Sequence, residues 1–130
     1  MKIALHVTAP PYSSEANLSA YNFVTAALRQ DHTVTRVFFS SDAVITGSAL
    51  TVPPQDELNL YTAWAELGIR HNIELILCVS ACLRRGIIDH TEAERYELDS
   101  ASLRKPFIIS GLGQLAEAAV ENDRLITFGN

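Results

Sequence analysis

Five short apolar runs stand out along the chain, and each ends at proline, glycine, serine or charged residues. They are rich in β-branched, aromatic and leucine side chains, a pattern typical of buried strands. We expect strands at residues 2–8, 33–39, 73–79, 107–109 and 125–128. Pro10 and Pro11 prevent the first run from continuing, because proline offers no N–H to a sheet.

The segments between these runs carry apolar residues three and four positions apart, which predicts amphipathic helices. We expect longer helices at 16–30, 56–71 and 111–121, and shorter helical pieces at 43–49, 80–85 and 91–96. The first helix should be capped by Ser13 or Ser14, and the piece at 91–96 by a capping box of Thr91 and Glu94. The expected apolar face of the helix at 56–71 consists of Leu58, Tyr61, Trp64, Ala65 and Ile69.

Strands and helices therefore alternate, with connections long enough to hold the helices. This order predicts an α/β fold with a mainly parallel five-stranded sheet and helices on both faces. Because the chain has no repeat, low-complexity tract or domain boundary, we expect residues 1–130 to form a single domain. In open α/β sheets the chemistry lies beyond the carboxyl ends of the strands.

Composition narrows the functional classes. A chain of 130 residues with 48% apolar and 19% charged residues can bury a core and is unlike a disordered protein. No apolar run approaches the roughly 18 residues of a membrane span, and residues 1–7 are too short for a signal peptide. The net charge of −5 disfavours binding to nucleic acid or an anionic membrane. We expect a cytoplasmic protein with reduced cysteines.

Cys78 is the strong nucleophile among the strand ends. It lies near the carboxyl end of the strand at 73–79, just before a helical turn, where backbone N–H groups favour a thiolate. Arg84 and Arg85 follow within two turns and add positive potential. Sulfur transfer, disulfide exchange and cysteine hydrolysis all need such a thiolate. The alternative is that Cys78 is a small apolar residue of the core.

Cys82 is expected to pack into the turn as an unreactive residue, since an intrahelical disulfide with Cys78 would be strained. The Cys-x3-Cys spacing is poor for zinc without further ligands. The four histidines are scattered over different elements: His6, His32, His71 and His90. We therefore expect no metal site.

Three short patterns suggest other chemistry. Cys78 and Arg84 have the Cys-x5-Arg spacing of cysteine phosphatases, with Asp89 as an imaginable general acid, but the loop between them has no glycine. Gly111-Leu112-Gly113-Gln114-Leu115-Ala116 matches a dinucleotide pattern but is expected to be a tight turn into a helix. The proline-containing loop after the first strand is unsuited to hold a flavin phosphate. No cofactor is expected.

Several motifs in order nevertheless resemble the DsrE family of sulfur-relay proteins, over nearly the whole chain. They are Ile76-Leu77-Cys78-Val79, Arg84-Arg85-Gly86-Ile87-Ile88-Asp89 with Glu92-Ala93, and Ser110-Gly111-Leu112-Gly113-Gln114-Leu115-Ala116-Glu117-Ala118. The resemblance implies a three-layer α/β/α fold. It also implies a sulfurtransferase in which Cys78 is the catalytic residue and carries a persulfide.

The same resemblance implies partners. Related subunits of the TusB and TusC types would join the chain in a heterohexamer, which takes sulfur from a TusA-like donor and passes it to a TusE-like acceptor. The implied destination is 2-thiolation of the wobble uridine of tRNA, or alternatively sulfur oxidation, in which relatives named DsrE work. The chain also has many apolar residues for its size, including Trp64, Tyr61 and Phe39, and we expect an isolated subunit to leave an apolar patch that the partners cover.

Overall fold

The structure is a computed structural model, and it describes residues 1–129. Five parallel strands form one sheet in the order β4-β3-β2-β1-β5. The strands are β1 (Lys2–Val7), β2 (Thr33–Phe39), β3 (Glu74–Cys78), β4 (Phe107–Ser110) and β5 (Arg124–Phe128). All five expected strands are present, and the fold class is confirmed.

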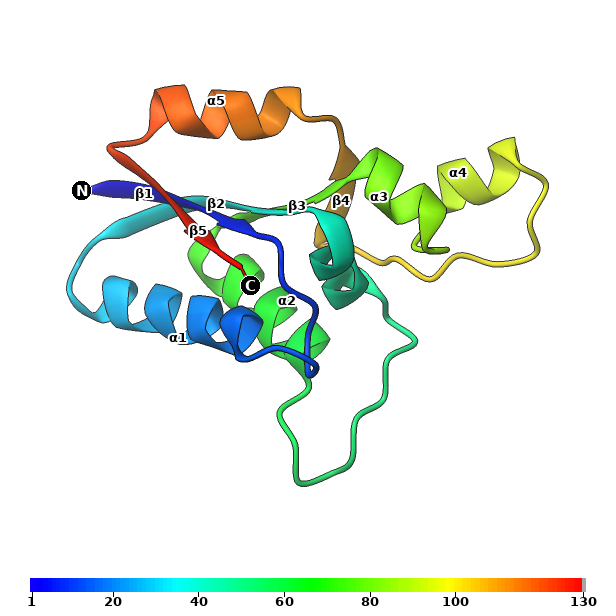
Figure 1. The fold of residues 1–130 in the computed structure, drawn as a ribbon, viewed down its shortest axis with the longest axis horizontal. Helices are drawn as coiled ribbons and strands as arrows, with labels where there is room; N and C mark the ends of the chain where they lie inside the picture. Colours follow the sequence, from blue (N-terminus) through cyan, green and yellow to red (C-terminus); the bar gives the residue numbers. More distant parts are fainter. Residues whose placement is uncertain (130) are drawn as a thin grey trace.

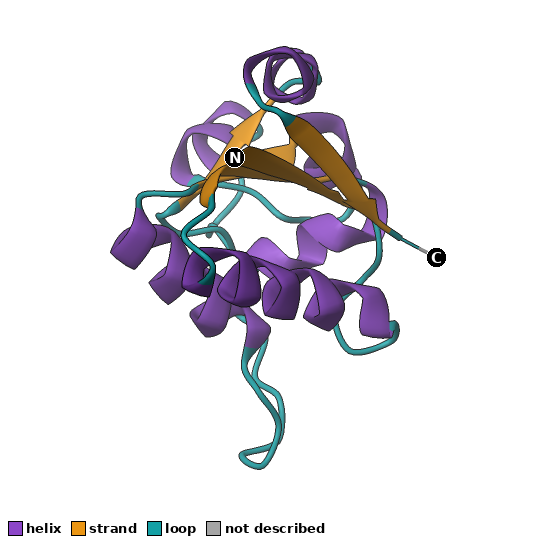
Figure 2. Cartoon of the chain, turned by 90° about the vertical axis from the view of Figure 1, so that its left-hand side faces the viewer, coloured by secondary structure: helices purple, strands orange, loops and turns teal. Residues whose placement is uncertain are grey.

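Helices cover both faces of this sheet. The helical segments are α1 (Glu15–Arg29), the 3₁₀ segment η1 (Ser41–Gly47), α2 (Leu60–His71), α3 (Val79–Arg84), α4 (His90–Arg95) and α5 (Gly113–Glu121). Helix α5 lies on one face, and α1 and α2 lie on the other (Figure 1). The view along the layers shows the single helix and the pair on opposite sides of the strands (Figure 2). The three layers follow from strands that are apolar on both sides and must be covered twice.

The core is continuous between the sheet and the α1–α2 layer. Its largest fully buried side chains include Trp64, Phe38, Phe39 and Phe107. Trp64 meets Phe39 edge-on, with ring centroids 5.4 Å apart. Trp64 and Phe39 therefore belong to the interior and are not part of any exposed apolar patch. Tyr61 is half-buried and stacks on Phe107 at 5.3 Å.

Helix α2 begins later than its expected start at residue 56. The side chain of Asn59 caps it by accepting the N–H of Thr62 at 3.1 Å. The expected apolar face is also rotated, because Leu58 and Ile69 are exposed while Leu60, Leu67 and Gly68 are buried. Gly68 explains the rotation, since a Cβ there would press on Leu75 of the sheet. A glycine on the buried side adds nothing to a count of apolar side chains.

The capping residues of α1 and α4 can be compared with those expected from the sequence. Ser14 caps α1, with its side chain accepting the N–H of Ala16, so this expectation is confirmed. The capping box of Thr91 and Glu94 is wrong, because α4 begins at His90. Asp89 is the cap and accepts the N–H of Glu92 at 2.8 Å. Within residues 1–129, no helix is both long and apolar enough to cross a bilayer.

Candidate functional site

Cys78 lies where the chain changes from β3 to α3, at the carboxyl edge of the sheet (Figure 1). It is the last residue of β3, it pairs in register with Ser110 of β4, and it is also the residue that precedes α3. The backbone of Cys78 thus belongs to the strand ladder, and its side chain lies beside the first N–H groups of α3. This placement agrees with the sequence expectation for the residue.

The residue is recessed, with 6% of its surface exposed. Burial opposes ionisation of the thiol, since a charge loses its hydration there. Hydrogen bonds from the Ser80 hydroxyl and from the backbone N–H groups of Ala81 and Ser80, together with the charge of Arg84, outweigh this effect of burial. The net effect is a pKa of Cys78 below its ordinary value, so the site favours a thiolate.

The two arginines after Cys78 have different partners. Arg84 is exposed and acts on Cys78 through its charge. Arg85 instead donates from Nε to Oδ1 of Asp42 in η1 at 2.9 Å, and from Nη1 to the carbonyl of Ala81 at 3.1 Å. Arg85 therefore ties α3 to η1, while Arg84 supplies the positive potential that the sequence suggested for both.

Cys82 lies one helical turn after Cys78 and is fully buried. Burial and the neighbouring Cys78 raise the pKa of Cys82 to about 12, so this thiol stays protonated at neutral pH. Both cysteines are free. The structure thus gives the two thiols opposite tendencies, and the expectation that Cys82 packs into the turn is confirmed.

The 3₁₀ segment η1 approaches β3 closely at the residue before Cys78. A Cβ on Gly47 would collide with the side chain of Leu77, the residue before Cys78. Nothing in the sequence distinguishes Gly47, because a glycine at the end of a short helical piece also fits an ordinary turn. Only the packing shows that the missing side chain lets η1 reach the strand.

Buried Asn17 holds η1 from the other side. Its Nδ2 donates to Oγ1 of Thr46 at 2.9 Å and to the carbonyl of Ala9 at 3.3 Å. Its Oδ1 accepts the indole N–H of Trp64 at 3.1 Å. This amide joins α1, α2, η1 and the chain after β1, although an asparagine within an amphipathic helix gives no sequence sign of being buried.

The structure does not build a phosphatase loop or a dinucleotide site from the other sequence patterns. Residues 79–84 form a helix, whereas the phosphatase reading needs a loop curled around an anion. Gly111 and Gly113 lead into α5 as a turn, as expected. Among residues 1–129, no group of three or more His, Cys, Asp or Glu side chains is placed to hold a metal ion.

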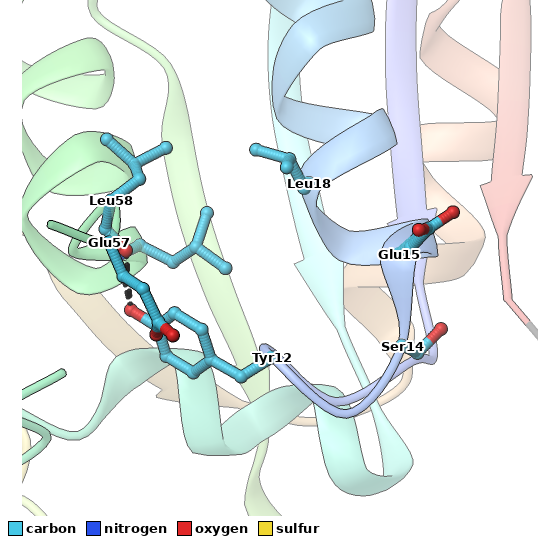
Figure 3. Close-up of a pocket in the computed structure, with 7 residues that line it drawn as sticks. Tyr12, Ser14, Glu15, Leu18, Glu57 and Leu58 are labelled. Atoms are coloured by element: carbon cyan, nitrogen blue, oxygen red, sulfur yellow. Dashed lines mark hydrogen bonds between the residues drawn. The ribbon is translucent and has the colours of Figure 1, made fainter. Parts of the chain in front are cut away.

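Two surface hollows lie near different parts of the fold. One of about 380 Å³ runs beside α3 and is lined by Leu83, Arg84, Gly86, Ile88, Tyr96 and Leu98. Another of about 260 Å³ lies between the start of α1 and the residues before α2 (Figure 3). At its edge the hydroxyl of Tyr12 donates to the carbonyl of Leu58 and accepts the N–H of Leu60, both at 2.9 Å. Cys78 lines neither of these two hollows.

Comparison with known proteins places this geometry in a family. The DsrE protein of Allochromatium vinosum is 45% identical over 130 residues, which cover both chains completely. Sulfurtransferase TusD of Salmonella dublin is 45% identical over 128 residues, covering 98% of this chain and 100% of the relative. Sulfurtransferase TusD of Serratia proteamaculans is 45% identical over 124 residues, covering 95% and 96%.

A solved structure shares the fold. The ychN protein of E. coli superposes with a TM-score of 0.78 at 24% identity, covering 98% of this chain and 99% of the other. The model of the DsrE/DsrF-like family matches residues 1–128. By this match and by its identity to full-length relatives, the chain belongs to the DsrE/DsrF-like family.

Proposed function

We propose that this protein is a sulfur-relay sulfurtransferase in which Cys78 carries sulfane sulfur as a persulfide. The observation that carries the proposal is the recessed thiol at the end of β3, whose pKa is lowered by hydrogen bonds from Ser80 and Ala81 and by the charge of Arg84. The names of the TusD relatives support the same activity. The proposal treats residues 1–130 as one sulfur-carrier domain.

Both half-reactions are thiol–persulfide exchanges. In the first, the Cys78 thiolate attacks the outer sulfur of the donor's persulfide. The donor's S–S bond breaks, and its electron pair leaves on the donor thiolate. In the second, the acceptor thiolate attacks the outer sulfur now on Cys78, and the electron pair of that bond returns to Sγ. Neither step changes the overall oxidation level, so no cofactor or general acid is required.

The recessed thiol is consistent with protein substrates. A persulfide that a partner presents on an extended loop or terminus can reach such a thiol. The apolar hollow beside α3, lined in part by Leu83 and Arg84, offers a surface for such a partner on the helix that follows Cys78. On the family resemblance we propose a TusA-like donor and a TusE-like acceptor.

The proposed destination is the wobble uridine of tRNA, with the chain working in the cytoplasm beside TusB- and TusC-like subunits in a heterohexamer. A DsrE-type carrier in sulfur oxidation is the second candidate, because the DsrE and TusD relatives are equally identical to this chain. The thiouridine content of tRNA in cells lacking the protein tests the destination. An unchanged thiouridine content would favour the second candidate and would not contradict the proposed persulfide chemistry of Cys78.

The decisive experiment is intact-mass analysis after incubation with a persulfide donor. We expect the wild type to gain the mass of one sulfur atom and Cys78→Ser to gain none, because serine keeps the size but loses the soft nucleophile. Cys82→Ala is the matched control and should gain sulfur as the wild type does. Equal sulfur loading of the Cys78→Ser variant would refute the proposed role of Cys78.

A further inference from the structure

The hydroxyl of Ser80 is a side-chain partner of the candidate nucleophile. Ser80 is the second residue of α3, and its Oγ lies 3.5 Å from Sγ of Cys78. This distance is suitable for a hydrogen bond to sulfur, whose van der Waals radius is larger than that of oxygen. Ser80 is itself exposed, whereas Cys78 is buried.

A hydroxyl can serve the sulfur in either charge state, because it both donates and accepts. A neutral thiol can donate to Ser80, but a thiolate has no proton, so the hydroxyl must then donate to it. A hydrogen bond to a charged acceptor is about twice as strong as a neutral one. The pair is therefore stabilised most when Sγ carries negative charge.

We propose that Ser80 is a positioning residue for sulfur transfer, whose hydroxyl donates a hydrogen bond to Sγ of Cys78 whenever that sulfur is anionic. This inference rests on the proposed persulfide function. Sγ is anionic twice in each cycle: before it attacks the donor's outer sulfur, and again when the acceptor removes that sulfur and the electron pair returns to Sγ. The same hydroxyl would act at both moments.

Sulfur loading and sulfur removal should respond differently to loss of the Ser80 hydroxyl. Without it, less Cys78 is ionised at neutral pH, so loading slows. A more basic thiolate is, however, a better nucleophile once formed and a poorer leaving group. Loading by a Ser80→Ala variant should therefore recover at high pH, whereas removal of sulfur from its persulfide should stay slow. A purely structural defect would slow both steps at every pH.

Other charges near the sulfur must be kept constant in the comparison. Arg84 acts on Cys78 from the same helix. The buried Cys82 thiol is coupled to Cys78, and Asp89, just before α4, and Arg85 act on Cys82. Asp42 of η1 is paired with Arg85. A Ser80→Ala substitution changes none of these groups, so a shift in the titration of Cys78 reports the hydroxyl.

The first test is the pH dependence of Cys78 alkylation by iodoacetamide, followed by intact mass. We expect Ser80→Ala to shift the midpoint to higher pH and to slow alkylation about threefold to tenfold below both midpoints. Ser80→Thr keeps a hydroxyl and should restore most of the rate. Ser19→Ala, at an exposed position of α1, is the matched control and should leave the profile unchanged.

The second test measures sulfur removal with cyanide, which takes the outer sulfur as thiocyanate and leaves the Cys78 thiolate. We expect persulfidated Ser80→Ala to release thiocyanate several-fold more slowly than the wild type, with Ser80→Thr again close to the wild type. An unchanged alkylation midpoint in folded Ser80→Ala would overturn the inference, as would slowing by the same factor above the midpoint. Neither result touches the persulfide function, which falls only if Cys78→Ser still loads sulfur.

Discussion

Cys78 and Cys82 lie one turn apart along α3, yet hydrogen bonds lower the pKa of the first while burial raises the pKa of the second to about 12. Charge on Cys78 further disfavours charge on Cys82. One of the two thiols is therefore prepared to react and the other to remain a neutral core residue. This division separates a carrier from a disulfide-forming pair, in which the second thiol would attack the persulfide and release sulfide.

We expect Cys82→Ala to leave sulfur transfer to an acceptor thiol within a few-fold of the wild type, because Cys82 is a protonated, buried group at neutral pH. The same argument predicts that no Cys78–Cys82 disulfide accumulates under mild oxidation, since the geometry within one turn is strained. Transfer kinetics and intact mass check the two parts. Lost transfer in a folded Cys82→Ala variant, or a clean loss of two protons on oxidation, would show that the second thiol takes part.

The raised pKa of Cys82 also predicts an alkaline weakness. In the unfolded chain this thiol ionises at its ordinary pKa, whereas in the folded chain it stays protonated up to about pH 12. Between these values the unfolded state binds fewer protons, so stability falls as pH rises, by about 1.4 kcal/mol per pH unit. Urea unfolding at pH 8 and pH 10 in reductant should show this loss in the wild type and a smaller loss in Cys82→Ala. Equal losses in both proteins would contradict the burial argument.

Cys78 behaves in the opposite sense. Because its folded pKa lies below the ordinary value, we expect sulfur loading to persist at neutral pH and to be lost as pH falls through that lowered pKa. The rate of loading from a small persulfide donor, measured across this range, should follow the same midpoint as alkylation. Arg84→Gln should move the midpoint upward, because it removes the nearby positive charge. A midpoint at the ordinary thiol value in the wild type would count against this account.

Arg36 offers a test of how α5 is held to the sheet. Its buried guanidinium meets Glu74 at 2.8 Å and Glu117 at 2.9 Å, and it also donates to the carbonyl of Gln114. Both carboxylates are about half exposed and can return to water, whereas the arginine cannot. We therefore expect the double variant Glu74→Ala/Glu117→Ala, which strands a buried charge, to lose about 2–3 kcal/mol of unfolding free energy.

Arg36→Met is the matched comparison, because it removes the charge and keeps much of the buried aliphatic volume. We expect it to cost about 1 kcal/mol, mainly from the lost hydrogen bond to Gln114. Urea titrations of both variants decide the order. A larger loss in Arg36→Met than in the double variant would mean that the ion pairs themselves, and not the penalty of an unpaired charge, stabilise this contact.

The proposed assembly makes a prediction about the segment between η1 and α2. It projects from the layers as a long loop (Figures 1 and 2) and carries exposed Leu50, Val52 and Leu58, with Val52 87% exposed. Co-expression with TusB- and TusC-like subunits should give a complex much larger than the 14.3 kDa chain. We expect Val52→Ser/Leu58→Ser to weaken it, because exposed apolar side chains of this kind gain from being covered.

Val120→Ser is the matched control, since Val120 of α5 is 83% exposed and lies on the other side of the sheet. Size exclusion at several concentrations measures the complexes. A monodisperse monomer that ignores both partners would contradict the assembly. An intact complex with Val52→Ser/Leu58→Ser and a broken one with Val120→Ser would place the interface on the α5 face.

The sequence alone determined the order of elements, the parallel sheet and the place of Cys78. These follow from local properties: β-branched runs bounded by breakers, helical spacing between them, and the rule that alternating strands and helices pair in parallel. Errors arose where a boundary depended on one polar side chain, as with the Asn59 and Asp89 caps, or on a glycine facing the sheet, as with Gly68. Such residues look alike in a pattern whether they cap, pack or face solvent.

What only the tertiary structure decided is the difference between neighbouring residues of the same type. Cys78 and Cys82 look similar in sequence, and so do Arg84 and Arg85, but each member of a pair faces different groups. Burial raises the pKa of Cys82 and keeps its thiol protonated. Arg85 forms an ion pair with Asp42, which is distant along the chain, whereas the charge of Arg84 acts on Cys78. Desolvation and ion pairing depend on which elements meet in space. The thiol that favours ionisation could therefore be told from its neighbour only from the packing of α3 against η1.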